Sequence, residues 1–590
     1  MTPPPAYRLS GDLFKKDRPA VGGQAGGGVR KAVLPVLAFF IVFYFYAGIS
    51  FVKKSAATYD ETVHLSSGYS YLETGKYRMN IMDHPPLAEM LAAAPLKFLK
   101  LNSFVTHRYF QSRMPYNYGD LFLYQNNADA EKILNTSRYF LLLFWSPLFL
   151  VLFYLFGRFS GGKNAGFAAV LLFSVNPVFI SNIPLVTTDI APAFFYFSAC
   201  LAGFLLSSGE KTGFRLLENR YALAAAGGAA AGLAMASKYS MFVLPPLFSA
   251  LLIFDNFFSN KFKIKELVKI ISVFLAVSLL ALLVVYKGDM TLYSDALTET
   301  FRRLSGGRSS FIMGKHSVEG VWWYFPAAFA LKSPLFLTAL FLAGLFFMFR
   351  EYRKFLWILA PFFFYFLSAM SSKVQIGVRH ILPALPFVLL IAAYGIVKIY
   401  DKFRRKSLYL LAPFFLFSFF SVAKTHPFYL SYFSEAAGGA EKGWEYLTDS
   451  NIDWGQDLKS LSGYLREKGN PPVVLAYFGV ANPAYYGLNY VPLGLVSNVP
   501  FEPSPADLCS SEKILLAVSV TNLQGTYYAD KDTFSWLRTR EPVYRAGYSI
   551  FLYDLTEDRE GAETLDKLFK KSGLGGYAAC ADKRRKAAAR

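Results

Sequence analysis

The feature that most constrains the fold of this chain is a series of apolar runs, each long enough to cross a membrane as a helix, which takes roughly 20 residues. With 54% hydrophobic and only 17% charged residues, the chain has more apolar material than a soluble core requires. The predicted spans are 32–52, 139–156, 165–180, 190–206, 221–236, 239–254, 268–286, 325–349, 355–370, 381–399 and 408–423. We therefore expect an integral membrane protein that is mainly α, a polytopic transmembrane helix bundle of about eleven spans.

Basic residues predict the orientation of this bundle in the membrane. The net charge of +20 comes mostly from Lys and Arg in short clusters between apolar runs, so we expect no nucleic-acid partner. Such clusters mark the cytoplasmic side of a membrane protein. They fall on alternate connections, at 15–31, 158–163, 211–220, 261–269, 350–354 and 398–406. The N-terminus is therefore predicted to be cytoplasmic, and an odd number of spans places the C-terminal part outside.

The positions of the predicted spans also divide the chain into domains. We expect a disordered cytoplasmic leader at 1–31, a transmembrane domain at 32–424 with outer loops at 53–138 and 287–324, a soluble extracytoplasmic domain at 425–582, and a basic tail at 583–590.

The soluble domain is predicted to be small and α/β. Its expected elements are a helix at 454–468 that Asp453 opens and strands at 473–478, 514–520 and 549–553. Its cysteines, Cys509 and Cys580, either pair in an oxidising compartment or remain free thiols.

Two acids and a histidine lie in the first outer loop, close to the membrane. Asp60 and Glu61 follow the first span, and His84 precedes Pro85 and Pro86. Asp60 is either the N-cap of the next helix or a general base that faces a cavity, with Glu61 and His84 tuning it or binding a cation. Spacing alone leaves both interpretations open.

Charged residues also stand at the outer ends of later spans. Asp189 either caps a helix or is a functional carboxylate, since unpaired charge is costly at membrane depth. Lys238, Arg379 and His380 lie where few cations are expected. They either snorkel to ordinary phospholipid or bind an anionic lipid headgroup. Lys332, just inside the eighth span, is a further candidate or an interfacial residue.

Together these motifs resemble the protein O-mannosyltransferase-like family, membrane glycosyltransferases of the GT-C class that use polyprenyl-phosphate-linked sugars outside the cytoplasm. The resemblance covers most of 59–386 and continues into 449–458, which looks like the junction before a soluble domain in bacterial relatives. The residues that carry it are Asp60-Glu61, His84-Pro85-Pro86, Thr188-Asp189, Gly232-Leu233-Ala234 followed by Lys238, and Arg379-His380 with Pro383. The sugar-binding repeats of eukaryotic mannosyltransferases are not found in the tail. The resemblance therefore does not imply that the acceptor is a protein, and the acceptor stays open.

The resemblance implies a chemistry for these residues. Asp60 would be catalytic and take the proton of an acceptor hydroxyl as its oxygen attacks C1 of the sugar, with inversion, while Glu61 would orient a neighbour. The departing lipid phosphate would be bound by Lys238, Arg379 and His380, because fixed cations stabilise the charge that it gains.

His84 and Asp189 would support the site. With Asp60 they could hold magnesium or manganese, which prefer hard oxygen ligands, but the resemblance implies a reaction without a cofactor. The expected partners are a polyprenyl-phosphate-linked sugar donor, membrane lipid, and an acceptor that is a protein, a glycolipid or a cell-envelope glycan. The expected location is a bacterial inner or plasma membrane, with the active site on the extracytoplasmic face.

Two other classes of function stay open. A secondary transporter also has many spans, broken helices and intramembrane charges, but those charges should lie mid-span and the two halves should show matched interruptions. A non-catalytic assembly protein of an envelope complex would use the soluble tail and would tolerate substitutions at Asp60, Lys238 and Arg379.

Overall fold

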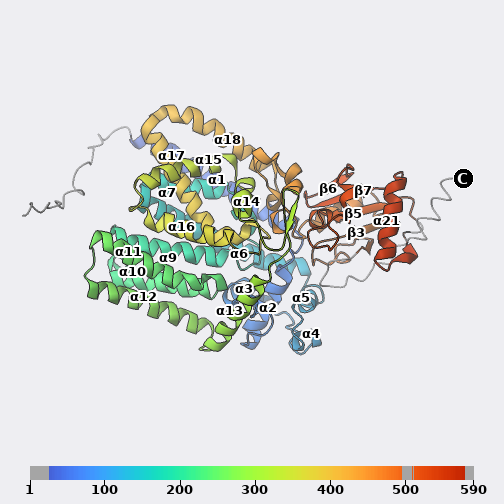
Figure 1. The fold of residues 1–590 in the computed structure, drawn as a ribbon, viewed down its shortest axis with the longest axis horizontal. Coiled ribbons are helices and arrows are strands. Elements are labelled where there is room, and N and C mark those ends of the chain that lie inside the picture. Colours follow the sequence, from blue (N-terminus) through green and yellow to red (C-terminus); the bar gives the residue numbers. More distant parts are fainter. Residues whose placement is uncertain (1–25, 494–507, 509–510, 578–590) are drawn as a thin grey trace, which may run out of the picture.

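The computed structural model describes residues 26–493, 508 and 511–577, and Figure 1 shows a helical bundle with a small sheet beside one end of it. Residues 1–25 of the expected leader and the whole expected basic tail lie outside the described residues, as do Cys509 and Cys580. The first helix begins at Gly26, so the last part of the expected disordered leader is helical instead.

Helical structure coincides with each predicted span. The helices are α1 (Gly26–Lys54), α6 (Ala130–Gly161), α7 (Lys163–Ser174) with α8 (Pro177–Asn182), α9 (Ile190–Ser208), α10 (Arg220–Met235), α11 (Leu244–Ser259), α12 (Ile264–Val285), α14 (Tyr324–Lys332) with α15 (Leu335–Arg350), α16 (Leu356–Met370), α17 (Leu385–Phe403) and α18 (Leu408–Lys424). By length and composition, 6 segments of the described chain can each cross a membrane: Leu34–Lys54, Ala130–Gly161, Ile190–Ser208, Tyr239–Ser259, Ile264–Val285 and Val378–Lys424. The mainly helical fold and the integral membrane character are confirmed, and the count of eleven spans stays a prediction.

Two of the predicted spans are interrupted, and proline explains both breaks. A single helix over 325–349 is wrong, because Ser333 is extended and Pro334, which has no N–H group to donate, separates α14 from α15. In the third span Asn176 accepts hydrogen bonds from two backbone N–H groups, and Pro177 follows it at the first position of α8.

Close packing of α10 against α12 fixes the position of Lys238. Gly228 and Gly232 present no side chain to α12, and a Cβ at Gly232 would lie 2.3 Å from the carbonyl oxygen of Ser278. Small residues four positions apart let two membrane helices approach backbone to backbone. Because α10 ends at Met235, Lys238 follows directly at the end of this tightly packed pair.

Contacts between connections show which of them share an end of the bundle. Lys261 donates to the carbonyl oxygen of Ser207 at 2.8 Å, and Lys398 pairs with Glu351 at 3.2 Å. These contacts join helix ends that the charge pattern assigns to the cytoplasm. The connections predicted to face outward meet at the other end, where Lys238 lies. The grouping of the connections agrees with the charge pattern, and the side of the membrane that each group faces stays a prediction.

Short helices and a hairpin form the two large loops that are predicted to face outward. They are α2 (Glu61–Thr74), α3 (Pro86–Ala93), α4 (Arg108–Gln111) and α5 (Pro115–Tyr124) in the first loop, and α13 (Met290–Ser305) with the antiparallel strands β1 (Ser310–Ile312) and β2 (Lys315–Ser317) in the second. A Cβ at Gly68 of α2 would lie 2.1 Å from the carbonyl oxygen of Glu89 in α3. The glycine therefore lets α2 and α3 pack backbone to backbone.

The C-terminal part contains a five-stranded sheet of order β4-β3-β5-β7-β6. Its elements are β3 (Val473–Ala476), β4 (Tyr490–Pro492), β5 (Leu515–Ser519), β6 (Tyr544–Ala546) and β7 (Ile550–Asp554), with helices α19 (Leu458–Glu467), α20 (Val520–Leu523) and α21 (Arg559–Lys571). β3 runs parallel to β4 and β5, whereas β7 is antiparallel to β5 and β6. All three predicted strands overlap observed ones.

The start of the predicted helix at 454–468 is wrong. The helix α19 begins at Leu458, and Asp453 is fully buried ahead of it. The carboxylate of Asp453 accepts a hydrogen bond from the backbone N–H of Thr521 at 2.8 Å. Long-range contacts of this kind hold the 449–457 segment in an irregular conformation that a local pattern does not predict.

Candidate active site

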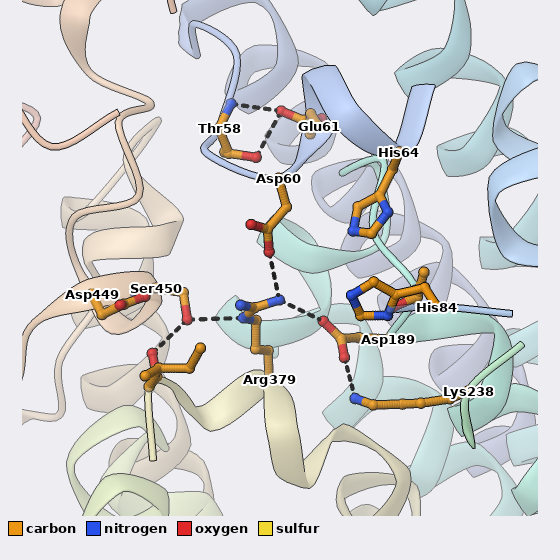
Figure 2. A network of polar contacts seen from close by, with 12 residues as sticks. Thr58, Asp60, Glu61, His64, His84, Asp189, Lys238, Arg379, Asp449 and Ser450 are labelled. Atoms are coloured by element: carbon orange, nitrogen blue, oxygen red, sulfur yellow. Dashed lines mark hydrogen bonds and ion pairs between the residues drawn. The ribbon is translucent and has the colours of Figure 1, made fainter. Parts of the chain in front are cut away.

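Asp60 lies at the start of α2 but does not cap it. It occupies the N-cap position, yet its side chain makes no capping hydrogen bond. Its Oδ2 instead lies 3.0 Å from Nη1 of Arg379, and the side chain remains 23% exposed. The capping interpretation of Asp60 is therefore wrong. Figure 2 shows the carboxylate pointing at the guanidinium.

Arg379 is the centre of the polar network. It precedes α17, and its Nε donates to Oγ of Ser450 at 3.0 Å. Its Nη1 donates to Oδ2 of Asp189 at 3.4 Å as well as pairing with Asp60. The guanidinium carbon lies 4.2 Å from the centre of the Trp454 ring. Two carboxylates, a hydroxyl and an indole face thus hold one planar cation, an environment that suits arginine better than lysine.

Asp189 and Lys238 extend this network into a chain of alternating charges. Asp189 occupies the N-cap position of α9 without a capping hydrogen bond, so its capping interpretation is also wrong. Its Oδ1 accepts from Nζ of Lys238 at 2.5 Å, and its side chain is only 2% exposed. Burial would raise the pKa of Asp189, but the Lys238 ammonium and the Arg379 guanidinium hold it below the ordinary range. Asp189 is therefore an ionised carboxylate between two cations.

Two histidines lie beside this chain of charges. Nδ1 of His84 is 3.1 Å from the Thr188 hydroxyl, and its ring meets that of His64 edge to face at 4.8 Å. Nδ1 of His64 lies 2.7 Å from Oε1 of Glu89, which also accepts from Asn80 at 2.6 Å. Burial, helped by His64, holds the pKa of His84 well below its usual value. His84 is therefore a neutral hydrogen-bonding group at neutral pH.

The structure places His380 and Lys332 differently from Lys238 and Arg379. Nε2 of His380 is buried and has no hydrogen-bond partner in the described part of the chain. Lys332 lies in a different place from the cation group that the sequence suggested. Its Nζ donates to the carbonyl oxygens of Leu430 at 2.8 Å and Asn451 at 2.5 Å. Lys332 thus ties the break between α14 and α15 to the segment that follows α18.

Glu61 forms a separate, fully buried ion pair with Arg138 of α6. Its carboxylate also accepts from the backbone N–H groups of Thr58 at 2.9 Å and Val186 at 3.0 Å. Burial would raise the pKa of Glu61, but Arg138 and these N–H groups hold it below the ordinary value. Its contacts are those of an anchor that fastens the loop carrying Asp60 to α6 and to the turn before α9.

Several residues in or around the network were not assigned to it from the sequence. They include His64, Glu89, Arg138, Ser450 and Trp454. Arg138 directly precedes the predicted span 139–156 at its outer end, where few cations are expected, and this signal was available for it. Ser450 and Trp454 lie in the 449–458 motif, which was recognised only as a junction.

The network offers cations rather than metal ligands. Within 26–493, 508 and 511–577, no group of three or more His, Cys, Asp or Glu side chains is arranged to hold a metal ion. Lys238 and Arg379 supply the positive charge that an anionic ligand needs. A reaction without a cofactor stays a prediction.

Comparison with known proteins gives one family match and several structural likenesses. The family model described as dolichyl-phosphate-mannose-protein mannosyltransferase matches residues 135–286. ArnT from Cupriavidus metallidurans bound to undecaprenyl phosphate is 11% identical, with a TM-score of 0.49 over 89% of this chain and 98% of ArnT. The archaeal oligosaccharyltransferase AglB from Archaeoglobus fulgidus, in complex with an inhibitory peptide and a dolichol-phosphate, is 14% identical, with a TM-score of 0.46 over 83% of this chain and 70% of AglB. No curated protein matches the sequence significantly.

Over residues 135–286, the family match confirms the predicted resemblance to the protein O-mannosyltransferase-like membrane glycosyltransferases. The matched segment contains Asp189 and Lys238. Asp60 and Arg379 lie outside it and are joined to it by the contacts described above.

Proposed function

We propose that this protein is a membrane glycosyltransferase that moves a sugar from a polyprenyl-phosphate carrier to an acceptor hydroxyl on the extracytoplasmic face of the membrane. One observation carries the proposal: a partly exposed carboxylate, Asp60, contacts Arg379, which shares the buried Asp189 with Lys238. A proton acceptor therefore lies beside two fixed cations at one end of an apolar helix bundle. The description of the matched family, which names a lipid-phosphate sugar, supports the same class of donor.

In the proposed reaction the acceptor oxygen attacks C1 of the sugar from the side opposite the phosphate. The bond from C1 to the phosphate oxygen breaks, and its electron pair leaves with the lipid phosphate. Asp60 takes the proton of the hydroxyl as the new bond forms. Arg379 and Lys238 neutralise the charge that the leaving phosphate gains. A single displacement of this kind inverts the configuration at C1.

The remaining residues of the network orient these groups. Asp189 is buried and paired on both oxygens, so it holds Arg379 and Lys238 at fixed positions instead of taking a proton. Glu61 anchors the loop that carries Asp60. His84 offers a neutral hydrogen bond beside the cations. The acceptor in this proposal is a protein, a glycolipid or a cell-envelope glycan.

Mass spectrometry of lipid-linked sugars and envelope glycans tests this function in cells that lack the gene. We expect one lipid-linked sugar to accumulate and one envelope product to disappear. The wild-type gene should reverse both changes, and an Asp60→Asn gene that gives equal amounts of protein should reverse neither. Full reversal by Asp60→Asn would overturn the proposed base.

A further inference from the structure

The segment that follows the bundle returns to the candidate active site. We propose that Ser450 is a positioning residue, which holds the guanidinium of Arg379 in the orientation that receives the donor phosphate. This inference rests on the proposed function. Ser450 is 3% exposed and lies 71 positions from Arg379 in the chain, in the junction before the C-terminal sheet.

The hydroxyl of Ser450 has a defined direction. It donates its hydrogen to the carbonyl oxygen of Ile376 at 2.7 Å, which leaves its lone pairs for Nε of Arg379. Gly377 makes room for this arrangement, since a Cβ there would lie 2.1 Å from Oγ of Ser450. The hydroxyl therefore contacts the backbone just before Arg379 and the side chain of Arg379 at once.

The backbone around Ser450 is also fixed. Oδ1 of Asp449 accepts from the N–H of Ser450 at 2.6 Å, and Oδ1 of Asn451 accepts from the N–H of Val378 at 2.9 Å. The carbonyl oxygen of Asn451 accepts from Nζ of Lys332 at 2.5 Å. These bonds fasten the junction to both sides of the bundle, so the Ser450 hydroxyl cannot follow a rotating guanidinium.

The contacts of Arg379 leave one nitrogen for a ligand. Nε is bound to Ser450, and Nη1 is shared by Asp60 and Asp189. Nη2 makes no hydrogen bond to any residue that the structure describes. The Trp454 ring covers one face of the guanidinium. The planar group is therefore held at its edge by Ser450 and at its face by Trp454. A phosphate oxygen can then bind Nη2 without any change in the orientation of the guanidinium.

Binding of undecaprenyl phosphate to the purified full-length protein tests this role, with the phosphate-free undecaprenol as a second probe. We expect Ser450→Ala to weaken binding of the phosphate about tenfold, in line with the loss of a hydrogen bond to a charged group. Binding of the undecaprenol should stay unchanged, because the hydroxyl acts only through the cation. Equal losses for both probes, or no loss for either, would overturn the positioning role.

A matched control and a second variant keep the result interpretable. Ser431→Ala removes another buried hydroxyl, in the segment between α18 and the junction. This hydroxyl donates to the carbonyl oxygen of Gly547 at 2.8 Å and does not contact Arg379, so the variant should bind both probes as the wild type does. If Ser450→Ala is not recovered as folded protein, Ser450→Cys keeps the volume and weakens the acceptor, and the same loss is expected.

Arg379→Lys separates this inference from the proposed function. It should weaken phosphate binding, and Ser450→Ala added to it should cause no further loss, since lysine has no Nε–H group for Ser450. An independent tenfold loss in the double variant would overturn the inference alone. Wild-type affinity in Arg379→Lys would instead overturn the proposed role of the cations.

Discussion

Asp60 and Asp189 share a single nitrogen of Arg379: their carboxylates lie 3.0 Å and 3.4 Å from Nη1. The two acids differ in exposure, since the side chain of Asp60 is 23% exposed and that of Asp189 only 2%. Only the exposed carboxylate can meet an incoming hydroxyl group. The buried one neutralises and orients the cations around it.

Asp60→Asn should abolish most of the transfer activity and leave the protein folded. An amide cannot accept the hydroxyl proton, and loss of a general base commonly costs at least about a hundredfold in rate. Transfer from lipid-linked sugar and thermal unfolding should be measured on the same preparation. Asp83→Asn is the matched control, because Asp83 is a half-exposed acid of the same loop that pairs with Arg303 at the surface. Equal activity in the two variants would contradict the assignment.

Lys238→Met should reduce both stability and donor affinity. We expect the free energy of unfolding to fall by about 2 kcal/mol, because Asp189 loses a charged hydrogen-bond partner. In the double variant Asp189→Asn with Lys238→Met, stability should recover since neither charge stays buried without its partner. Affinity for undecaprenyl phosphate should remain low. Recovery of both properties would show that Lys238 has only a structural role.

Glu61→Gln should destabilise the protein by about 3–5 kcal/mol, because it leaves Arg138 buried without a counter-ion. The pKa of Glu61 is lowered in the fold, so its stabilising effect is complete above the ordinary value of 4.5 and is lost as the pH falls through the lower folded value. The difference in unfolding temperature between wild type and variant should therefore shrink only in acid.

A surface acid serves as the reference for Glu61. Glu73→Gln breaks an exposed pair with Lys97 and should change stability by less than about 1 kcal/mol. The folded fraction of Glu61→Gln should keep transfer activity, unlike Asp60→Asn. A folded but inactive Glu61→Gln protein would instead place Glu61 in the chemistry.

Asp453 should make stability fall as the pH rises. Burial raises its pKa to about 7, so its stabilising effect is complete below the ordinary value of 3.8 and is lost as the pH rises through about 7. The shift corresponds to up to about 4 kcal/mol. Thermal unfolding between about pH 4 and pH 7 should show this slope in the wild type and a smaller one in Asp453→Asn. An unchanged slope in the variant would contradict the role of Asp453.

The charged residues at the centre of the network could be predicted, but their contacts and the residues around them could not. Lys238 and Arg379 stood out because outward cations are exceptions to the charge pattern, and Asp60 and Asp189 because they are acids at span ends. Their mutual contacts depend on how distant helices pack, which no local pattern contains. For Asp60 and Asp189, local reasoning favoured helix capping about as strongly as function, and long-range ion pairs decided the outcome.

In the 449–457 segment, long-range contacts that a local sequence pattern does not predict determine the conformation of the backbone as well. Its sequence resembles a junction, and its local pattern predicts a helix that starts behind Asp453. In the fold, Ser450 and Trp454 contact Arg379, and Asp453 contacts Thr521. Tertiary contacts override the local preference here, as they do at the break before Pro334.

The contact between Arg379 and Ser450 also sets the order in which the site is completed during synthesis. A chain emerges from its N-terminus, so Asp60, Asp189, Lys238 and Arg379 have all been translated before Ser450 appears. A stalled or prematurely terminated chain would carry the base and the cations without the hydroxyl that aligns them. Under the proposed function, unfinished copies would bind the lipid phosphate less tightly, and full affinity would come only after Ser450 has been translated.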